Sequence, residues 1–91
     1  MTKFAAPIIV LDSEGNQEQI GVVIATEEGA TVMVKAVRVL RPNGDAVDLG
    51  AMINEVSELT SSLDDIETTK ATAEKVVRSF KLVLGEWVAE G

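Results

Sequence analysis

The first half of the chain alternates short apolar stretches with turn-forming residues. Stretches rich in β-branched and other apolar residues cover residues 6–11, 17–25, 30–40 and 46–48. Loops of about four or five residues containing Gly, Asn or Pro separate strands of antiparallel meanders. The pattern therefore predicts an N-terminal antiparallel β meander of three to four short strands, within a small β domain at residues 1–49.

Two of these stretches are apolar at consecutive positions. Residues 8–11 and 22–24 are unbroken apolar runs. Because successive side chains of a strand point to opposite faces, such strands need cover on both faces. Three or four short strands cannot cover themselves, so the second half of the chain or other subunits must do it. Gly21, inside the second run, indicates a bulge or a close approach of backbones.

The second half, residues 50–91, has a different period. Its apolar residues fall at alternating steps of three and four, and no Gly or Pro interrupts residues 51–84. This spacing predicts a long C-terminal coiled-coil helix of about 50 Å, too long to pack wholly on its own small sheet. We expect its seam to be an oligomerisation surface. The seam residues are Leu49, Met52, Val56, Leu59, Leu63, Ile66, Ala73, Val77, Phe80, Leu84 and Trp87.

A helical hairpin is the alternative for the same residues. Residues 68–70 (Thr-Thr-Lys) include poor helix formers, and the serines at 61–62 followed by aspartates at 64–65 resemble a helix start. Folding back would also place the acidic segment 50–67 beside the more basic segment 68–91. The unbroken heptad phase favours the continuous helix, because a loop has no reason to preserve it.

Further apolar residues near the seam bear on the number of copies. Val76, Val83 and Val88 flank the seam and broaden it beyond a two-helix interface, so a trimer or larger bundle, or docking onto another protein, is favoured over a dimer. Lys70, at a seam position, is either a device that fixes the register or a lysine whose stem lies along apolar surface. Trp87 is either a docking anchor or a residue that closes the chain's own core.

Composition narrows the possible functions. The 91 residues form one small domain with 46% hydrophobic and 25% charged residues, and the formal net charge is −7. This acidity disfavours nucleic acids and anionic membranes as partners, and no apolar window is long enough to span a membrane. The apolar run at residues 5–11 has one lysine before it and no small-residue cleavage site after it, so we expect no signal peptide. We expect synthesis in the cytoplasm.

Candidate chemistry is sparse. The chain has no cysteine or histidine, which excludes disulfides, the usual zinc sites, thiol catalysis and histidine bases. Asp12, Glu14 and Asn16 alternate as at the start of a calcium loop, but glycine stands at the fourth position and no glutamate closes the loop. We therefore predict that the chain is not an enzyme and has no catalytic residue, metal site or cofactor.

Residues 41–50, Arg-Pro-Asn-Gly-Asp-Ala-Val-Asp-Leu-Gly, carry a resemblance. A small β domain that ends in such a turn and runs into a heptad helix is similar to trimeric bacteriophage virion appendages, the head-fibre and tail-fibre attachment proteins. The resemblance covers roughly residues 41–66. It implies a structural homotrimer within a larger protein assembly, in which the β region contacts the particle and the helices trimerise. Because the chain ends at Gly91 without a receptor-binding domain, a head decoration, fibre or adaptor role is favoured.

Two other functions are compatible with the sequence. An acidic inhibitor or nucleic-acid mimic would fit the basic groove of a target protein. Its negative face would consist of Glu55, Glu58, Asp64, Asp65 and Glu67. A small cytoplasmic regulatory or chaperone-like module would instead hold a client on an exposed apolar stripe near the C-terminus.

Overall fold

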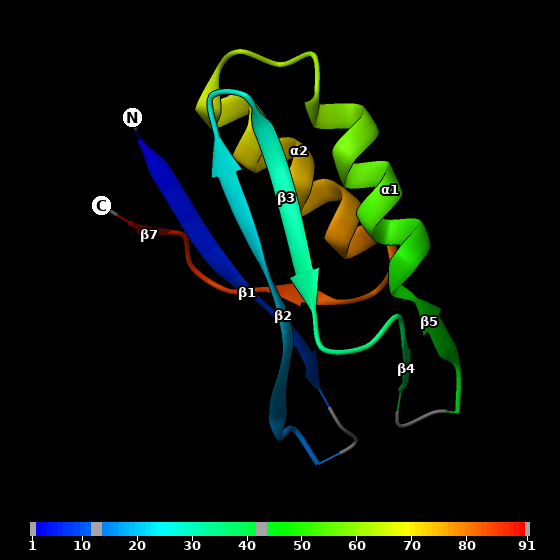
Figure 1. Cartoon of the computed structure of the whole chain (residues 1–91). Helices are drawn as coiled ribbons and strands as arrows, with labels where there is room; N and C mark the ends of the chain where they lie inside the picture. Colours follow the sequence, from blue (N-terminus) through cyan, green and yellow to red (C-terminus); the bar gives the residue numbers. More distant parts are fainter. Residues whose placement is uncertain (1, 12–13, 42–43, 91) are drawn as a thin grey trace.

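The chain folds into an antiparallel sheet that is backed by two helices (Figure 1). The computed structural model describes residues 2–11, 14–41 and 44–90. The strands are β1 (Lys3–Leu11), β2 (Gln17–Thr26), β3 (Gly29–Val34), β4 (Arg38–Leu40), β5 (Ala46–Asp48), β6 (Val83–Leu84) and β7 (Val88–Ala89), and the helices are α1 (Leu49–Thr60) and α2 (Ile66–Ser79). The α+β class and the N-terminal antiparallel sheet are confirmed.

The main sheet is built around β1. Its order is β3-β2-β1-β6, and β7 also pairs with β1. The register of β1 and β2 shifts between Ile8 and Ile9, where Gly21 is the partner of Ile8. A Cβ on residue 21 would collide with the carbonyl oxygen of Met33. Gly21 therefore serves both predicted purposes, a bulge and a close approach of backbones.

The C-terminal end of the chain completes the sheet along the second edge of β1. β6 pairs with residues 8–9 and β7 with residues 4–5. Between these two pairings, the carbonyl oxygen of Pro7 accepts a hydrogen bond from the amide of Gly85 at 2.8 Å. Proline has no N–H to donate, and it is tolerated here because the paired residues of β6 and β7 lie on either side of it.

Both helices lie on the same side of the sheet, so the core is a single layer of side chains between helices and strands (Figure 1). The carboxylate of Asp48 starts α1 by accepting a hydrogen bond from the amide of Ala51 at 3.1 Å. The buried apolar residues of the two layers are Ala6, Ile8, Val10, Ile20, Val23, Ala25 and Val32 from the sheet, and Leu49, Met52, Val56, Ala73, Val76 and Val77 from the helices. Residues from both halves of the chain thus share one core.

The predicted long coiled-coil helix is wrong, and two shorter helices, as in the hairpin alternative, take its place. α1 ends at Thr60 and α2 begins at Ile66. Asp65 starts α2, because its carboxylate accepts hydrogen bonds from the amide of Glu67 at 3.1 Å and the hydroxyl of Thr68 at 2.9 Å. The heptad phase misled because any short helix packed on a sheet shows the same three-four spacing as a coiled coil.

The strand predictions also need correction at two places. The stretch 30–40 is not one strand, since β3 ends at Val34 and β4 pairs with β5 in a separate two-stranded ribbon. The end of the predicted helix is not helical: Lys81, with φ of 63°, follows α2, and the chain continues into β6 and β7. The predicted turn at 41–44 lies partly outside the described residues, which resume at Gly44.

Candidate functional site

One face of the main sheet faces the helices, and the other is covered by no described part of the chain. Because strand residues alternate between faces, the neighbours of buried Ala6, Ile8 and Val10 point away from the helices. Their cross-strand partners extend this surface over β2, β3, β6 and β7. We call the largely apolar part of this surface the open face; it consists of Ala5, Pro7, Ile9, Leu11, Val22, Ile24, Thr31, Met33, Val83 and Val88. The same alternation places polar residues at its two ends, Lys3 at one and Gln17 and Gln19, the partners of Leu11 and Ile9, at the other.

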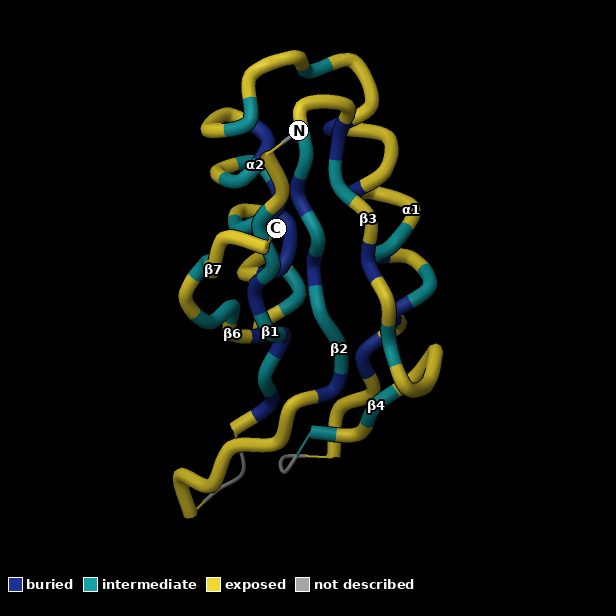
Figure 2. Tube along the Cα trace, turned by 60° about the vertical axis from the view of Figure 1, so that its left-hand side comes forward, coloured by how far each residue is buried: buried dark blue, intermediate teal, exposed yellow. Residues whose placement is uncertain are grey.

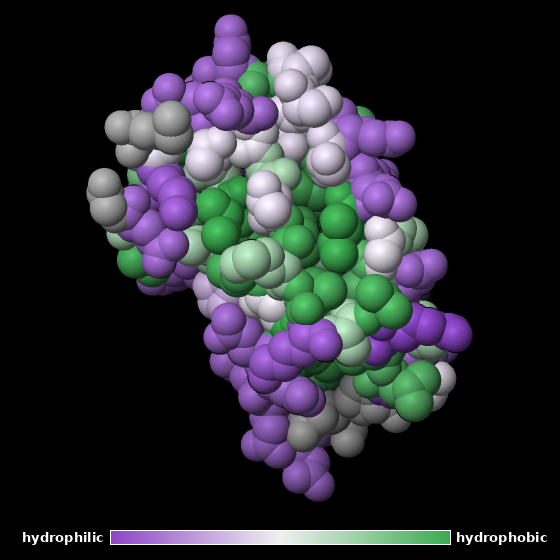
Figure 3. Space-filling model, viewed as in Figure 1, coloured by the Kyte–Doolittle hydropathy of each residue, from purple (hydrophilic) through white to green (hydrophobic). Residues whose placement is uncertain are grey.

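The open face is apolar and accessible. Its outer members are the most exposed, with Val88 at 61% and Met33 at 53%, while central members such as Val22 and Ile24 are half-buried among their neighbours (Figure 2). Figure 3 shows a hydrophobic area in the middle of the molecule with hydrophilic residues around it. None of the open-face residues carries a charge. Contiguous apolar patches with a polar rim typically mark interaction sites.

The sequence-predicted seam does not form one outward surface. Five of its members, Leu49, Met52, Val56, Ala73 and Val77, are fully buried. Leu63, Ile66, Phe80, Leu84 and Trp87 are half-buried, and Leu59 is exposed at 49%. Most of the heptad stripe therefore packs against the chain's own sheet, and Leu59 is the seam residue that remains most accessible.

Leu59 lies in a shallow groove between the two helices. The groove has a volume of about 300 Å³ and is lined by Glu55, Leu59, Thr72, Lys75, Val76 and Ser79. The charged side chains of Glu55 and Lys75 border it, so it offers less continuous apolar surface than the open face does.

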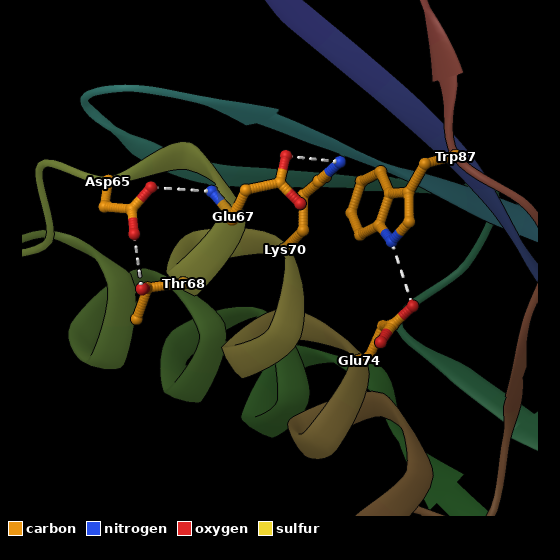
Figure 4. Close-up of polar contacts among 6 residues, drawn as sticks. All are labelled: Asp65, Glu67, Thr68, Lys70, Glu74 and Trp87. Atoms are coloured by element: carbon orange, nitrogen blue, oxygen red, sulfur yellow. Dashed lines mark hydrogen bonds and ion pairs between the residues drawn. The ribbon is translucent and has the colours of Figure 1, made fainter.

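Lys70 and Trp87 make contacts within the chain (Figure 4). The ammonium of Lys70 lies 4.0 Å from the centre of the Phe4 ring and 2.9 Å from the carboxylate of Glu67. The indole N–H of Trp87 donates a hydrogen bond to the carboxylate of Glu74 at 3.0 Å, and the ring packs against the core. Both residues therefore attach α2 to the sheet and to the C-terminal segment.

The residues of the predicted acidic face are all exposed, but they lie on two elements. Glu55 and Glu58 belong to α1, whereas the others lie before α2 or in its first turn. Asp65 caps α2 and Glu67 pairs with Lys70, so these two carboxylates already have partners within the chain. These five acidic residues thus lie on the helices or between them, and none of them belongs to the open face.

Other chemistry finds little support among the described residues. No three of their aspartate or glutamate side chains are placed to hold a metal ion, and Asp12 of the calcium-like pattern lies outside the described ranges. Within the same ranges, neither helix has the length and apolar character needed to cross a bilayer.

Comparisons with protein-family models, with curated proteins and with solved structures find no match for this chain. The open face is therefore defined by the geometry of this molecule alone. None of its residues belongs to the predicted seam. The signal that could have found them is the pair of unbroken apolar runs at 8–11 and 22–24, which require cover on both faces of the sheet.

Proposed function

We propose that this chain is a non-enzymatic structural protein that assembles with itself through protein–protein contacts. The observation that carries the proposal is the open face, an uncharged apolar surface on a chain whose formal net charge is −7. Burial of such a surface is the dominant favourable term in most protein associations. A partner is its natural complement, because exposed apolar area in water contributes nothing to the stability of a single chain.

The resemblance to bacteriophage virion appendages supplies the proposed setting, a small head decoration, fibre or adaptor protein within a larger assembly. Among residues 41–50, which carry the resemblance, Ala46–Asp48 form β5 and the next two residues begin α1. The continuous stem that favoured three copies is absent, since α1 and α2 pack on the sheet instead. We therefore base self-assembly on the sheet and leave the helical stem out of the proposal.

The two other functions have weaker support. A chaperone-like grip needs an exposed apolar stripe along the C-terminal helix, but Val76 and Val77 are buried there, and the exposed Val83 and Val88 lie on two-residue strands at the edge of the open face. An inhibitor that mimics nucleic acid needs one acidic face, but these carboxylates are divided between two elements and two of them already have partners.

The experiment is the mass of the full chain in solution, measured by light scattering after size exclusion over a wide range of protein concentrations. We expect species at a multiple of the 9.7 kDa chain mass, with the average mass falling on dilution. Circular dichroism on the same samples checks that the protein is folded. A folded species that stays at the chain mass at every concentration would contradict self-assembly.

A further inference from the structure

We infer that the open face binds the open face of a second copy, so that two sheets stack into a sandwich with the helices outside. This inference rests on the proposed self-assembly and specifies its surface, partner and symmetry. Two identical patches that face each other are related by a two-fold axis, which is the commonest symmetry of soluble oligomers. Sheets with apolar inner faces pack in this way at a separation of about 10 Å.

The chain itself does not supply the missing cover. All described elements are already placed in the sheet, the helix layer or the β4–β5 ribbon. Within residues 1–91, each stretch outside the described ranges has only one or two residues. Such stretches are too short to cover a surface that spans β3 to β7.

The positions of the charged side chains favour a dimer that forms through the open face over one that forms through the helices. In the sandwich the two sheets lie between the two helix layers, and three layer spacings of about 10 Å each place the helix axes of the two copies about 30 Å apart. That distance exceeds the screening length of about 8 Å at physiological salt, so the carboxylates on the helix layers of the two copies scarcely repel. Contact through the groove at Leu59 would instead bury the charged side chains of Glu55 and Lys75, which border it, at a cost in desolvation that the open face avoids.

No side chain at residue 85 projects beside Pro7 at the centre of the open face. The ring of Pro7 occupies the space beside Gly85, where a Cβ would lie 2.6 Å from the Cγ of Pro7. Because residue 85 has no side chain there, the proline and its neighbours Ile9 and Val22 can meet a flat partner surface.

The size of the face predicts the strength of the contact. With about 4.8 Å between strands and about 3.3 Å per residue, a patch four strands wide and six residues long measures about 400 Å² in projection. A standard interface buries about 800 Å² on each partner. The dimer therefore belongs to the weaker class of complexes and dissociates on dilution.

The test compares three full-length proteins, the natural chain, Met33→Glu and Leu59→Glu, by mass against concentration. Met33 lies on the open face and Leu59 in the helix groove, and their side chains are similarly exposed, at 53% and 49%. In Met33→Glu the dissociation constant should rise about 100-fold or more, because each copy brings an unpaired carboxylate into an apolar contact. Leu59→Glu should dimerise like the natural chain.

A second measurement avoids introducing charge. The chain has no cysteine, so Val22→Cys and Leu59→Cys each carry a single thiol. Val22 lies near the centre of the open face, and residues near a two-fold axis meet their own counterparts. A short bifunctional thiol reagent should therefore link Val22→Cys into dimers much faster than Leu59→Cys.

The outcomes separate this inference from the proposed self-assembly. A folded natural chain that is always monomeric overturns both. An oligomer that survives Met33→Glu and is not linked through Val22→Cys keeps self-assembly but overturns the open face as its surface. If Leu59→Glu alone dissociates the oligomer, the copies meet through the helix groove.

Discussion

The two faces of the sheet are made of the same kinds of side chain but differ in what covers them. Ile8 is fully buried under the helices, whereas Ile9, the next residue of the same strand, is half-buried on the open face. The difference does not lie in the hydrophobicity of the strands. It arises because the chain provides helices for one face only. The covered face therefore contributes most to the stability of the single chain, and the open face contributes fully only when another molecule covers it.

The largest expected effect comes from removing a side chain on each face in turn. Ile8→Ala should lower the free energy of unfolding by about 3 kcal/mol, because it leaves a cavity in a packed core. Ile9→Ala, measured at a concentration where the chain is monomeric, should lower it by about 1 kcal/mol, since that side chain already contacts water. Urea denaturation followed by circular dichroism gives both values.

Measuring the same two variants at several protein concentrations makes the difference between the two faces clearer. The loss from Ile9→Ala should grow as the concentration rises into the range where the natural chain dimerises, because association stabilises the folded state by mass action. The loss from Ile8→Ala should stay nearly constant. Equal losses for the two variants at low concentration would contradict the distinction between the faces.

Removing the hydroxyl of Thr60, which joins α1 to β3, has the next largest expected effect on the free energy of unfolding. The buried hydroxyl of Thr60, at the end of α1, accepts a hydrogen bond from the amide of Ala30 at 3.0 Å and donates one to the carbonyl of Val56 at 2.7 Å. It thereby binds the outer edge of β3, where a free amide would invite pairing with another strand. Thr60→Val should lower the free energy of unfolding by about 2 kcal/mol, because it leaves the Ala30 amide without its acceptor.

Hydrogen exchange distinguishes the lost bond from a change in packing. The Ala30 amide should lose protection in Thr60→Val and keep it in Thr60→Ser, which retains the hydroxyl. If the amide exchanges equally slowly in both variants, the hydroxyl of Thr60 is not what protects this edge.

Local sequence signals predicted the strands well, because their information lies within a few residues. The apolar runs before and after the turns became β1, β2 and part of β3, and Gly21 marked the bulge. The aspartates at 64–65 also indicated where α2 begins, since Asp65 is its N-cap residue. What misled was the heptad phase, a longer-range pattern that two short helices on one sheet reproduce without forming a coiled coil.

The open face could be predicted only in part. The unbroken apolar runs indicated that both faces of the sheet need cover, but they could not say which face the helices would take. That choice depends on how Leu49, Met52 and Val77 pack against the sheet, which is a tertiary property. The strands at the C-terminus were missed because β6 and β7 have two residues each, too few to show a period.

The smallest expected effect is a gain in stability, and it tests how strictly the covered face excludes water. Thr69, in α2, is fully buried like Thr60, but its hydroxyl has no hydrogen-bond partner among the residues that the structure describes. Thr69→Val keeps the shape of the side chain and removes the unpaired hydroxyl, and the two residues have similar helix propensity. We expect the free energy of unfolding to rise by about 1 kcal/mol, seen as an increase of about 4–8 °C in Tm. Thr68→Val is the matched control, because the exposed hydroxyl of Thr68 binds the cap Asp65 and its loss should give no gain. A lower Tm for Thr69→Val would mean that water or another group reaches this hydroxyl, and that the covered face is less closed than its burial indicates.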